Sequence, residues 1–284
     1  MINNKVHSYD NPMQKSRPFL KWAGNKYRLL NQILPSLPNA RRLIEPFAGS
    51  AALFINTDYP NYWLCEINND LVELFLCVQK EGESFIAYCE TFFLENNNSE
   101  TQYYLLRDQF NQSTDIRERA ALFLYLNRHG YNGLCRYNSK RIFNVPFGQI
   151  KRAYFPRKEM LYFHKKSSNA TFTRCDFRET FKIATSEDLI YCDPPYSPRS
   201  QSSNFSSYTE IEFGEKEHIE LALLATEHTK KGGIVIISNH DTEFTRHHYH
   251  RSNIKSFPVQ RFISCKGNNR LQVQEILAIF TPES

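Results

Sequence analysis

The sequence is short of the features that mark secreted and membrane proteins. None of its seven cysteines forms a C-x-x-C pair, and an odd number of cysteines does not suit a disulfide framework. No apolar stretch approaches the roughly 20 residues that a membrane-spanning helix needs, and residues 1–16 are polar, without the apolar core of a signal peptide. We therefore expect a reduced, cytoplasmic protein with no metal site and no membrane partner.

Acidic residues are missing from one long part of the chain. No Asp or Glu lies between Glu118 and Glu159, and residues 107–158 hold 11 Lys and Arg against 3 Asp and Glu, a formal charge of +8 in a chain whose total is +5. Tyr and Asn residues are interleaved with these bases. Such a run is typical of a surface that faces nucleic-acid phosphates, although a solvated basic face has the same composition.

The remaining composition favours a folded protein with alternating strands and helices. The 284 residues include 22 Phe and 16 Tyr, which is ample for one large or two small domains. Short β-favouring runs predict strands at 43–45, 62–65, 171–174, 188–192, 233–237 and 273–280. Apolar spacing and turn residues predict helices over about 26–34, after 46–52, and at 71–78, 120–126 and 215–229. Alternation of this kind predicts an α/β doubly wound sheet.

Two of these units have the spacing of a nucleotide site. A strand leads into the turn 46–52 around Gly49, and a second strand ends at Glu66, where doubly wound folds bind ribose hydroxyls. The Gly-x-Gly-x-x-Gly fingerprint is absent, which disfavours a dehydrogenase. Earlier in the chain, Trp22 offers a flat ring and Lys26 a cation for a carboxylate. Glu66 as a surface carboxylate and Trp22 as a core residue remain open.

The strand 188–192 runs directly into Asp193-Pro194-Pro195-Tyr196. The two prolines stiffen the backbone and remove two N–H donors, so a carboxylate, a carbonyl and an aromatic ring project together from the strand end. Asp193 and the Pro194 carbonyl could each accept one hydrogen of an exocyclic amine while Tyr196 stacks on the base. An ordinary turn at a strand end is the alternative.

Taken together, these stretches resemble a known enzyme family. The motifs occur in the order of the α-group amino methyltransferases, and more narrowly they are similar to the Dam family of DNA adenine-N6 methyltransferases. The resemblance runs from about Arg17 to Pro282 and is carried by residues 19–26, 45–49, 66–71, 126–138, 143–148, 193–196 and 237–242.

The family resemblance implies the architecture and the partners. It implies a doubly wound, mostly parallel Rossmann-like methyltransferase sheet with an inserted helical and β-hairpin target-recognition domain. The expected divisions are an N-terminal extension (1–16), a discontinuous catalytic domain (17–68 and 157–284) and a DNA-binding domain (69–156) with a hairpin at 131–149. S-adenosylmethionine is the implied methyl donor, without a metal. Double-stranded DNA is the implied substrate of a monomer in the bacterial cytoplasm or nucleoid.

The same resemblance assigns residues to the two substrates. The donor would contact Trp22, Lys26, Phe47, Gly49, Glu66 and Asp193. Catalysis would rest on Asp193, Pro194, Pro195 and Tyr196. Glu66 stands where the family usually has Asp, and Ala51 stands where it often has a second glycine, so that a positive φ there would cost strain of about 1 kcal/mol.

Matches to the family's recognition residues imply the target GATC. Arg136 would read a guanine edge and Lys21 the first guanine, while Leu134 and Pro146 contact base edges. Tyr131 would wedge into the base stack and Asn132 would lie near the unpaired thymine. Phosphate contacts are expected from Arg107, Arg128, Asn138 and Asn144.

The implied chemistry requires that adenine leave the base stack, because N6 is paired in duplex DNA. Asp193 and the Pro194 carbonyl would orient N6 toward the donor methyl, and no covalent intermediate is needed; the chain also lacks the Pro-Cys dipeptide of cytosine-C5 enzymes. Residues 197–212 are expected either to close over the adenine or to form an ordinary loop. The histidines at 247, 248 and 250 are expected at the surface.

Two alternatives remain at this stage. The same chemistry could act on cytosine N4, RNA or a glutamine side chain, or the chain could be a DNA-binding relative that has lost catalysis, for which Ala51 is the only hint. The sequence does not decide between a solitary enzyme, a phage enzyme and a restriction-modification partner.

Overall fold

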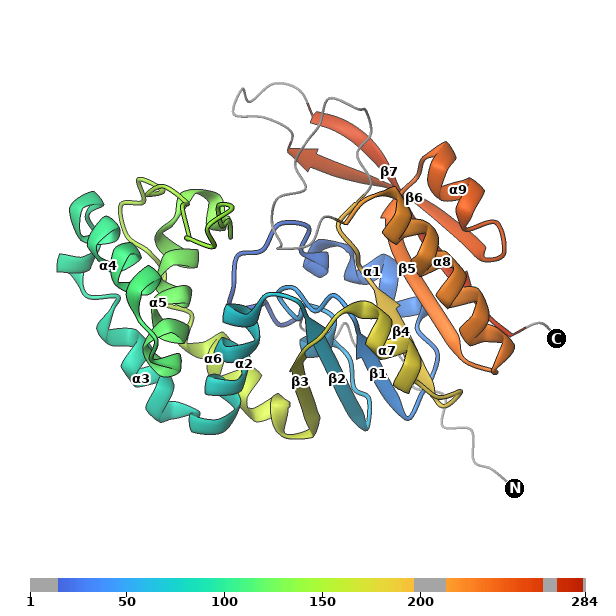
Figure 1. Cartoon of the computed structure of the whole chain (residues 1–284), viewed down its shortest axis with the longest axis horizontal. Helices are drawn as coiled ribbons and strands as arrows, with labels where there is room; N and C mark the ends of the chain where they lie inside the picture. The colour runs from blue at the N-terminus through green and yellow to red at the C-terminus, as the bar shows by residue number, and fades with distance from the viewer. Residues whose placement is uncertain (1–14, 197–212, 263–269, 283–284) are drawn as a thin grey trace.

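A central sheet organises the part of the chain that the computed structural model describes, residues 15–196, 213–262 and 270–282. In this part the sheet has seven strands in the order β3-β2-β1-β4-β5-β7-β6 (Figure 1). The strands are β1 (Arg42–Glu45), β2 (Asn61–Glu66), β3 (Ala170–Arg174), β4 (Asp188–Cys192), β5 (Ile234–His240), β6 (Asn253–Phe262) and β7 (Arg270–Phe280). β1 to β5 pair in parallel, whereas β7 is antiparallel to both β5 and β6. The predicted doubly wound, mostly parallel sheet is thus confirmed.

Buried apolar side chains lie on both faces of this sheet. Along β1, Leu43 belongs to one buried cluster and Ile44 to the other, as the alternation of a strand requires. α7 (Phe177–Ile183) and α8 (Glu215–Lys230) cover the face of Ile44. The face of Leu43 is covered by α1 (Leu30–Ile33), α2 (Asn69–Glu81) and α6 (Arg157–Lys166). Burial on both faces explains why the parallel strands read as continuous apolar runs.

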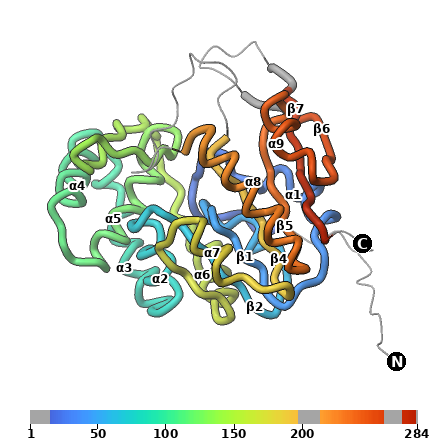
Figure 2. The backbone as a smooth tube through the Cα atoms, turned by 45° about the vertical axis from the view of Figure 1, so that its right-hand side comes forward, coloured from blue at the N-terminus to red at the C-terminus, as the bar shows by residue number. Residues whose placement is uncertain are grey.

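A group of helices lies beside the β3 edge. α3 (Glu83–Thr91), α4 (Glu100–Gln112) and α5 (Ile116–His129) gather there in both views, away from α9 (Glu243–His248) (Figures 1 and 2). α2 joins this group to the sheet, because its predicted apolar stripe is fully buried and one hydrophobic cluster runs through it. None of the described helices combines the length and apolarity needed to cross a bilayer.

The start of α5 differs from a full capping box. Asp115 accepts a hydrogen bond from the Glu118 backbone N–H at 2.7 Å. The Glu118 carboxylate, however, accepts hydrogen bonds from Gln109 and Ser113 rather than from the backbone at Asp115. The helix therefore has one half of the reciprocal cap and a link to the end of α4.

Two predicted helices are wrong in type. Residues 26–34 form a 3-10 turn, η1 (Lys26–Leu29), then the single turn α1, and a further 3-10 turn, η2 (Leu34–Ser36), rather than one helix. After 46–52 the chain forms only the short η3 (Phe54–Asn56). This turn ends at Thr57, whose backbone is extended and whose hydroxyl donates to the Leu53 carbonyl.

The expected hairpin 131–149 has the path of a hairpin but no strand ladder. It begins with a 3-10 turn, η5 (Tyr131–Gly133), and contains only two isolated bridges, Tyr137 with Phe143 and Gly130 with Phe147. Positive φ angles at 132, 141 and 149 interrupt the extended backbone. At the tip, Asn138 closes the turn by accepting from the backbone N–H groups of 140 and 142.

Candidate active site

β1 and β4 are neighbours in the sheet, but the chain continues from β1 to β2 on one side and from β4 to β5 on the other side. In doubly wound folds the crevice at the carboxyl ends of two such strands is the usual binding site. Glu45 is the last residue of β1, and Asp193 directly follows β4. Chain segments distant in sequence therefore meet at this edge.

Three predicted residues contact one another here. The Lys26 Nζ lies 2.6 Å from Asp193 Oδ1 and donates to the Gly24 carbonyl at 2.9 Å. The same ammonium lies 4.5 Å from the centre of the Tyr196 ring. Lys26 is only 5% exposed, whereas the Asp193 side chain is 21% exposed. The carboxylate, the cation and the aromatic ring thus form one compact group.

The carboxylate and the ring are each held by further contacts. Ser238 on β5 donates to Asp193 Oδ1 at 3.0 Å, and the Tyr196 hydroxyl donates to Glu275 Oε2 on β7 at 3.0 Å. The His240 ring meets the Tyr196 ring nearly at right angles, with centroids 4.6 Å apart. Burial raises the pKa of Asp193, while Lys26 and Ser238 favour its charged form. The site is therefore oriented by three neighbouring strands.

The two prolines are placed differently. Pro194 is buried directly behind Asp193, and Pro195 is exposed. Both peptide bonds are trans, because the described residues contain no cis peptide. The fixed backbone holds the Asp193 carboxylate and the Tyr196 ring at the end of β4, as the sequence predicted.

The predicted donor residues lie around the turn after β1. Glu66 accepts from the backbone N–H groups of Gly49 at 3.1 Å, Ile67 at 3.0 Å and Asn68 at 3.2 Å. These donors lower the pKa of Glu66, but burial has the larger effect and raises it. A Cβ at Gly49 would lie 3.0 Å from the Trp22 ring. Trp22 is thus a partly exposed ring packed on a glycine, not a core residue.

Phe47 joins an aromatic group that the sequence did not indicate. Its ring stacks on Phe177 with centroids 5.5 Å apart and meets Phe213 edge-on at 5.4 Å. The neighbouring Ala51 is fully buried, and its left-handed φ confirms that this position needs the conformation in which the family often has glycine. The Cβ of Ala51 is accommodated within the core, at a strain of about 1 kcal/mol.

Glu45 is a site residue that the sequence analysis did not single out. It is 4% exposed, and its Oε1 is buried with no hydrogen-bond partner among the described residues. Burial, with a smaller contribution from the nearby Asp193, raises its pKa to about 8. The signal in the sequence was a carboxylate as the last residue of a strand before a glycine turn.

Replacing Glu45 with Gln is expected to flatten the dependence of stability on pH. The folded protein keeps the Glu45 proton up to about pH 8, whereas the unfolded chain loses it near the ordinary value of 4.5. The free energy of unfolding therefore falls as pH rises between these values, by up to about 1.4 kcal/mol per pH unit from this group. Denaturant titrations at pH 5, 6.5 and 8 measure the slope, with the exposed Glu187→Gln as the control. Equal slopes in the native protein and Glu45→Gln would contradict the assignment.

The loop 131–149 sorts its residues onto two sides. Gly133, Cys135, Phe143 and Val145 are buried, whereas their neighbours face outward. The outward side carries the predicted DNA-contacting residues Tyr131, Asn132, Leu134, Arg136, Asn138, Asn144 and Pro146, which are exposed or partly exposed. Seven of the ten residues predicted to contact DNA thus lie on one loop with their side chains exposed or partly exposed.

Arg136 has a defined orientation on this surface. Its Nε donates to Asn144 Oδ1 at 2.7 Å, and its Nη2 donates to the Asn144 carbonyl at 3.1 Å. The guanidinium plane is therefore fixed by the opposite limb of the loop. Asn144, predicted to hold a phosphate, here positions Arg136.

The other three predicted DNA contacts are partly buried bases that donate to backbone carbonyls. Lys21 donates to Arg128, Arg128 to Tyr154 and Arg107 to Val145, at 3.1 to 3.2 Å. Burial lowers the pKa of Lys21 and of Arg128. Their role toward DNA stays a prediction.

Asn127 connects the loop 131–149 with the segment that carries Trp22 and Lys26. Its side chain accepts from the Lys21 backbone N–H at 2.9 Å and donates to the Lys21 carbonyl at 2.7 Å. It also donates to the Gly133 carbonyl at 3.2 Å. A Cβ at Gly133 would clash with the Lys21 side chain, at 2.3 Å. The segment with the predicted donor residues and the loop with the predicted DNA contacts are therefore in direct contact.

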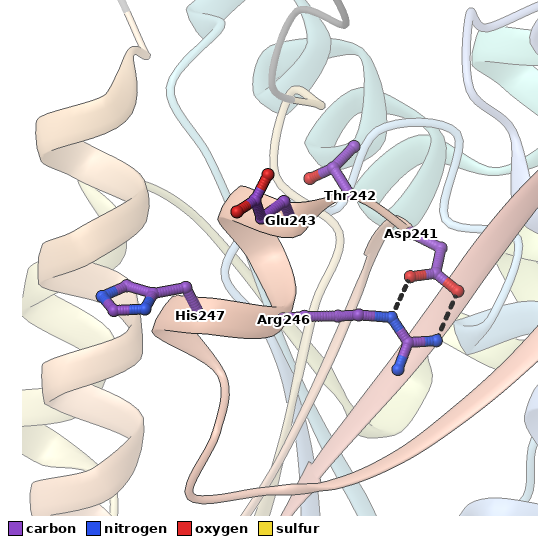
Figure 3. A pocket seen from close by; sticks show the side chains of 5 residues that line it. All are labelled: Asp241, Thr242, Glu243, Arg246 and His247. Atoms are coloured by element: carbon purple, nitrogen blue, oxygen red, sulfur yellow. Dashed lines mark hydrogen bonds and ion pairs between the residues drawn. The ribbon is translucent and has the colours of Figure 1, made fainter.

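A hollow beside α9 is separate from this group. It is lined by Asp241, Thr242, Glu243, Arg246 and His247 (Figure 3). Arg246 binds both carboxylate oxygens of Asp241, at 2.5 and 2.8 Å, and lowers its pKa. No group of three His, Cys, Asp or Glu residues able to hold a metal occurs among the described residues. The segments 197–212 and 1–14 lie outside the described residues.

The fold and the site define a doubly wound enzyme that holds a carboxylate, a cation and an aromatic ring at the switch point of its sheet. The model of the family described as D12 class N6 adenine-specific DNA methyltransferase matches residues 22–263. The chain belongs to this family and is an adenine-specific DNA methyltransferase.

Curated relatives agree over nearly the whole length. A DNA adenine methylase of Haemophilus influenzae is 48% identical over 272 residues, covering 95% of each chain. A DNA adenine methylase of Escherichia coli K12 is 42% identical over 270 residues, covering 95% of this chain and 97% of that one. Among solved structures, a precorrin 8W decarboxylase from Methanobacterium thermoautotrophicum aligns with a TM-score of 0.37 and 10% identity over 90% of this chain and 89% of that one, too distant a similarity to bear on function.

Proposed function

We propose that this chain transfers a methyl group from S-adenosylmethionine to N6 of adenine in the duplex sequence GATC. The observation that carries the proposal is the contact group of Lys26, Asp193 and Tyr196 at the end of β4, beside the turn after β1. The proposal includes a catalytic domain at 17–68 and 157–284 and a DNA-recognition domain at 69–156. It also includes a monomeric enzyme.

The residues after β1 and β2 fit the donor. Glu66 supplies a carboxylate for ribose hydroxyls, at the place where doubly wound folds use one. Glu45 Oε1, a buried oxygen without a hydrogen-bond partner among the described residues, fits the donor's ammonium group. Lys26 supplies a cation for its carboxylate, and Trp22 a flat ring beside Gly49. Phe47 lies next to the same turn.

The donor supplies a methyl group on a sulfonium. Asp193 accepts one hydrogen of the adenine amine, the Pro194 carbonyl accepts the other, and Tyr196 stacks on the base. With both hydrogens held, the N6 lone pair is turned toward the methyl carbon. The new C–N bond forms as the C–S bond breaks, and its electron pair stays on sulfur. N6 then releases one proton, and no covalent bond to the protein is made.

The outward side of the loop 131–149 supports GATC as the target. Arg136, with its plane fixed by Asn144, suits the bidentate contact to guanine O6 and N7. Lys21 lies between Asn127 and Gly133, close to both the loop and Trp22. A reader of the first guanine would there be adjacent to the donor site. The basic residues Lys140, Lys151 and Arg152 are exposed, and we propose that they contact phosphates.

Transfer of labelled methyl from S-adenosylmethionine tests the proposal. Label is expected as N6-methyladenine in a duplex with one GATC and not in a matched GTAC duplex. Equal labelling of both duplexes would keep the chemistry and remove the assignment of Arg136, Leu134 and Lys21. Label in cytosine, RNA or protein, or none despite donor binding, would contradict the proposed substrate. A protein that does not bind the donor would be a DNA-binding relative without catalysis.

A further inference from the structure

The Lys26 ammonium is almost completely enclosed by protein groups. It contacts Asp193 Oδ1 at 2.6 Å, the Gly24 carbonyl at 2.9 Å and the Tyr196 ring at 4.5 Å from its centre. Only 5% of the residue is exposed. A lysine normally keeps its ammonium in water, so these contacts replace hydration and hold the side chain in one position.

This position conflicts with the proposed binding of adenine. A base whose amine bonds to Asp193 while its ring stacks on Tyr196 must lie between these two groups. One ammonium touches both of them, so it covers the side of the ring that faces the carboxylate. The ammonium and the base cannot occupy this space together, and Lys26 must move before the base enters.

We propose that Lys26 closes the adenine pocket by pairing with Asp193, and that the carboxylate of the methyl donor opens it by drawing the ammonium away. This inference rests on the proposed function and deepens it. It gives Lys26 a role beyond donor binding, since the same residue decides when the flipped base is admitted. Donor binding would then precede capture of the base.

The exchange leaves no buried polar group unsatisfied. When Lys26 leaves, an amine hydrogen of adenine takes its place on Asp193 Oδ1, and Ser238 stays bonded to the same oxygen. Lys26 gains the donor's carboxylate in place of Asp193. Between the two steps Asp193 keeps the Ser238 hydrogen bond, and Lys26 is paired with the donor's carboxylate, so the cation exchanges one carboxylate for another.

The backbone turn at residues 22–25 connects Lys26 with Trp22, the aromatic residue proposed to contact the donor. Residues 22–25 form a turn in which the Asn25 N–H donates to the Trp22 carbonyl at 3.2 Å, and the Asn25 side chain caps the start of η1. Gly24 in this turn has a φ of 75°, and a Cβ built there meets nothing within 4 Å. A ligand packed on Trp22 is therefore close to Lys26, and the turn leaves space for it.

Photocrosslinking to Tyr196 tests the order of events. A duplex carrying 5-iodouracil at the target position of GATC is irradiated with the protein, and the yield of adduct at Tyr196 is measured by mass spectrometry. The native protein is expected to give little adduct alone and severalfold more with S-adenosylhomocysteine. Methylthioadenosine, which has the nucleoside but no carboxylate, is expected to leave the yield low.

The variant Lys26→Met is the decisive arm. Without a cation on Asp193 the pocket stands open, so this variant is expected to give the high yield without any ligand. Lys231→Met is the matched control, because Lys231 is an exposed lysine before β5, at the opposite end of the strands from the site. It is expected to behave like the native protein.

The outcomes separate this inference from the proposed function. Equal adduct yields from the native protein and Lys26→Met without ligand, at any level, would overturn it. An equal effect of S-adenosylhomocysteine and methylthioadenosine would overturn the role of the carboxylate. Methyl transfer to GATC is measured on the same native preparation. Normal transfer with equal yields would leave the proposed function intact, whereas loss of transfer would remove the proposed function itself.

Discussion

Asp193→Ala is expected to abolish methyl transfer while DNA binding largely survives. The change removes the acceptor that holds the adenine amine and also leaves Lys26 buried without its ion partner. Loss of one group oriented toward the reacting centre typically costs on the order of 10²–10³-fold in rate, and the disturbance at Lys26 adds to it. Single-turnover transfer to a GATC duplex measures the rate, and fluorescence anisotropy measures duplex affinity.

Asp241→Ala is the control for this experiment. Asp241 also follows a central strand and is also paired with a base, Arg246, but it lines the separate hollow beside α9 (Figure 3). Its loss is expected to change the transfer rate little. If Asp193→Ala transferred methyl groups at a near-native rate, the assignment of the active site would be wrong.

Arg136→Ala is expected to relax discrimination at one G·C pair of the target. A bidentate contact to guanine contributes about 1–3 kcal/mol of discrimination, so the preference over a duplex altered at that pair falls roughly 5- to 150-fold. The structure strengthens this expectation because Asn144 holds the guanidinium plane through two hydrogen bonds. kcat/KM for GATC and for duplexes with single altered base pairs measures the effect.

Lys140→Ala separates base reading from general attraction to DNA. Lys140 is exposed at the tip of the same loop, where a phosphate contact is expected. Its loss is expected to weaken binding to all duplexes alike and to reduce the salt dependence by about one unit of slope. A uniform loss from Arg136→Ala as well would show that Arg136 binds phosphate and does not read a base.

Much of the fold was predictable because its signals are local. β1 to β5 and β7 each contain a β-favouring run, and a proline or glycine lies near one end of all of these strands except β3. β6 was missed because Pro258 argues against a strand, yet β6 is the edge strand of the sheet, where proline is tolerated. The helix expected after 46–52 is only the short η3, because the chain becomes extended again at Thr57 before it enters β2.

The sequence by itself determined the identities and the order of the reacting groups. Asp193 to Tyr196, the turn around Gly49 and Glu66 could be assigned because fixed spacing and strand ends set them in place. The predicted DNA contacts of the loop 131–149 came from the family resemblance alone.

Only the tertiary structure decided which partners these groups have. Lys26 pairs with Asp193, which is 167 positions away, and Asn127 binds the backbone of Lys21. Glu45 Oε1 is buried without a hydrogen-bond partner among the described residues. Such contacts depend on the strand order and on which groups are buried together, and burial, not residue type, sets whether a carboxylate is charged. Local sequence does not specify the strand order or which groups are buried together, because both arise from packing of the whole sheet.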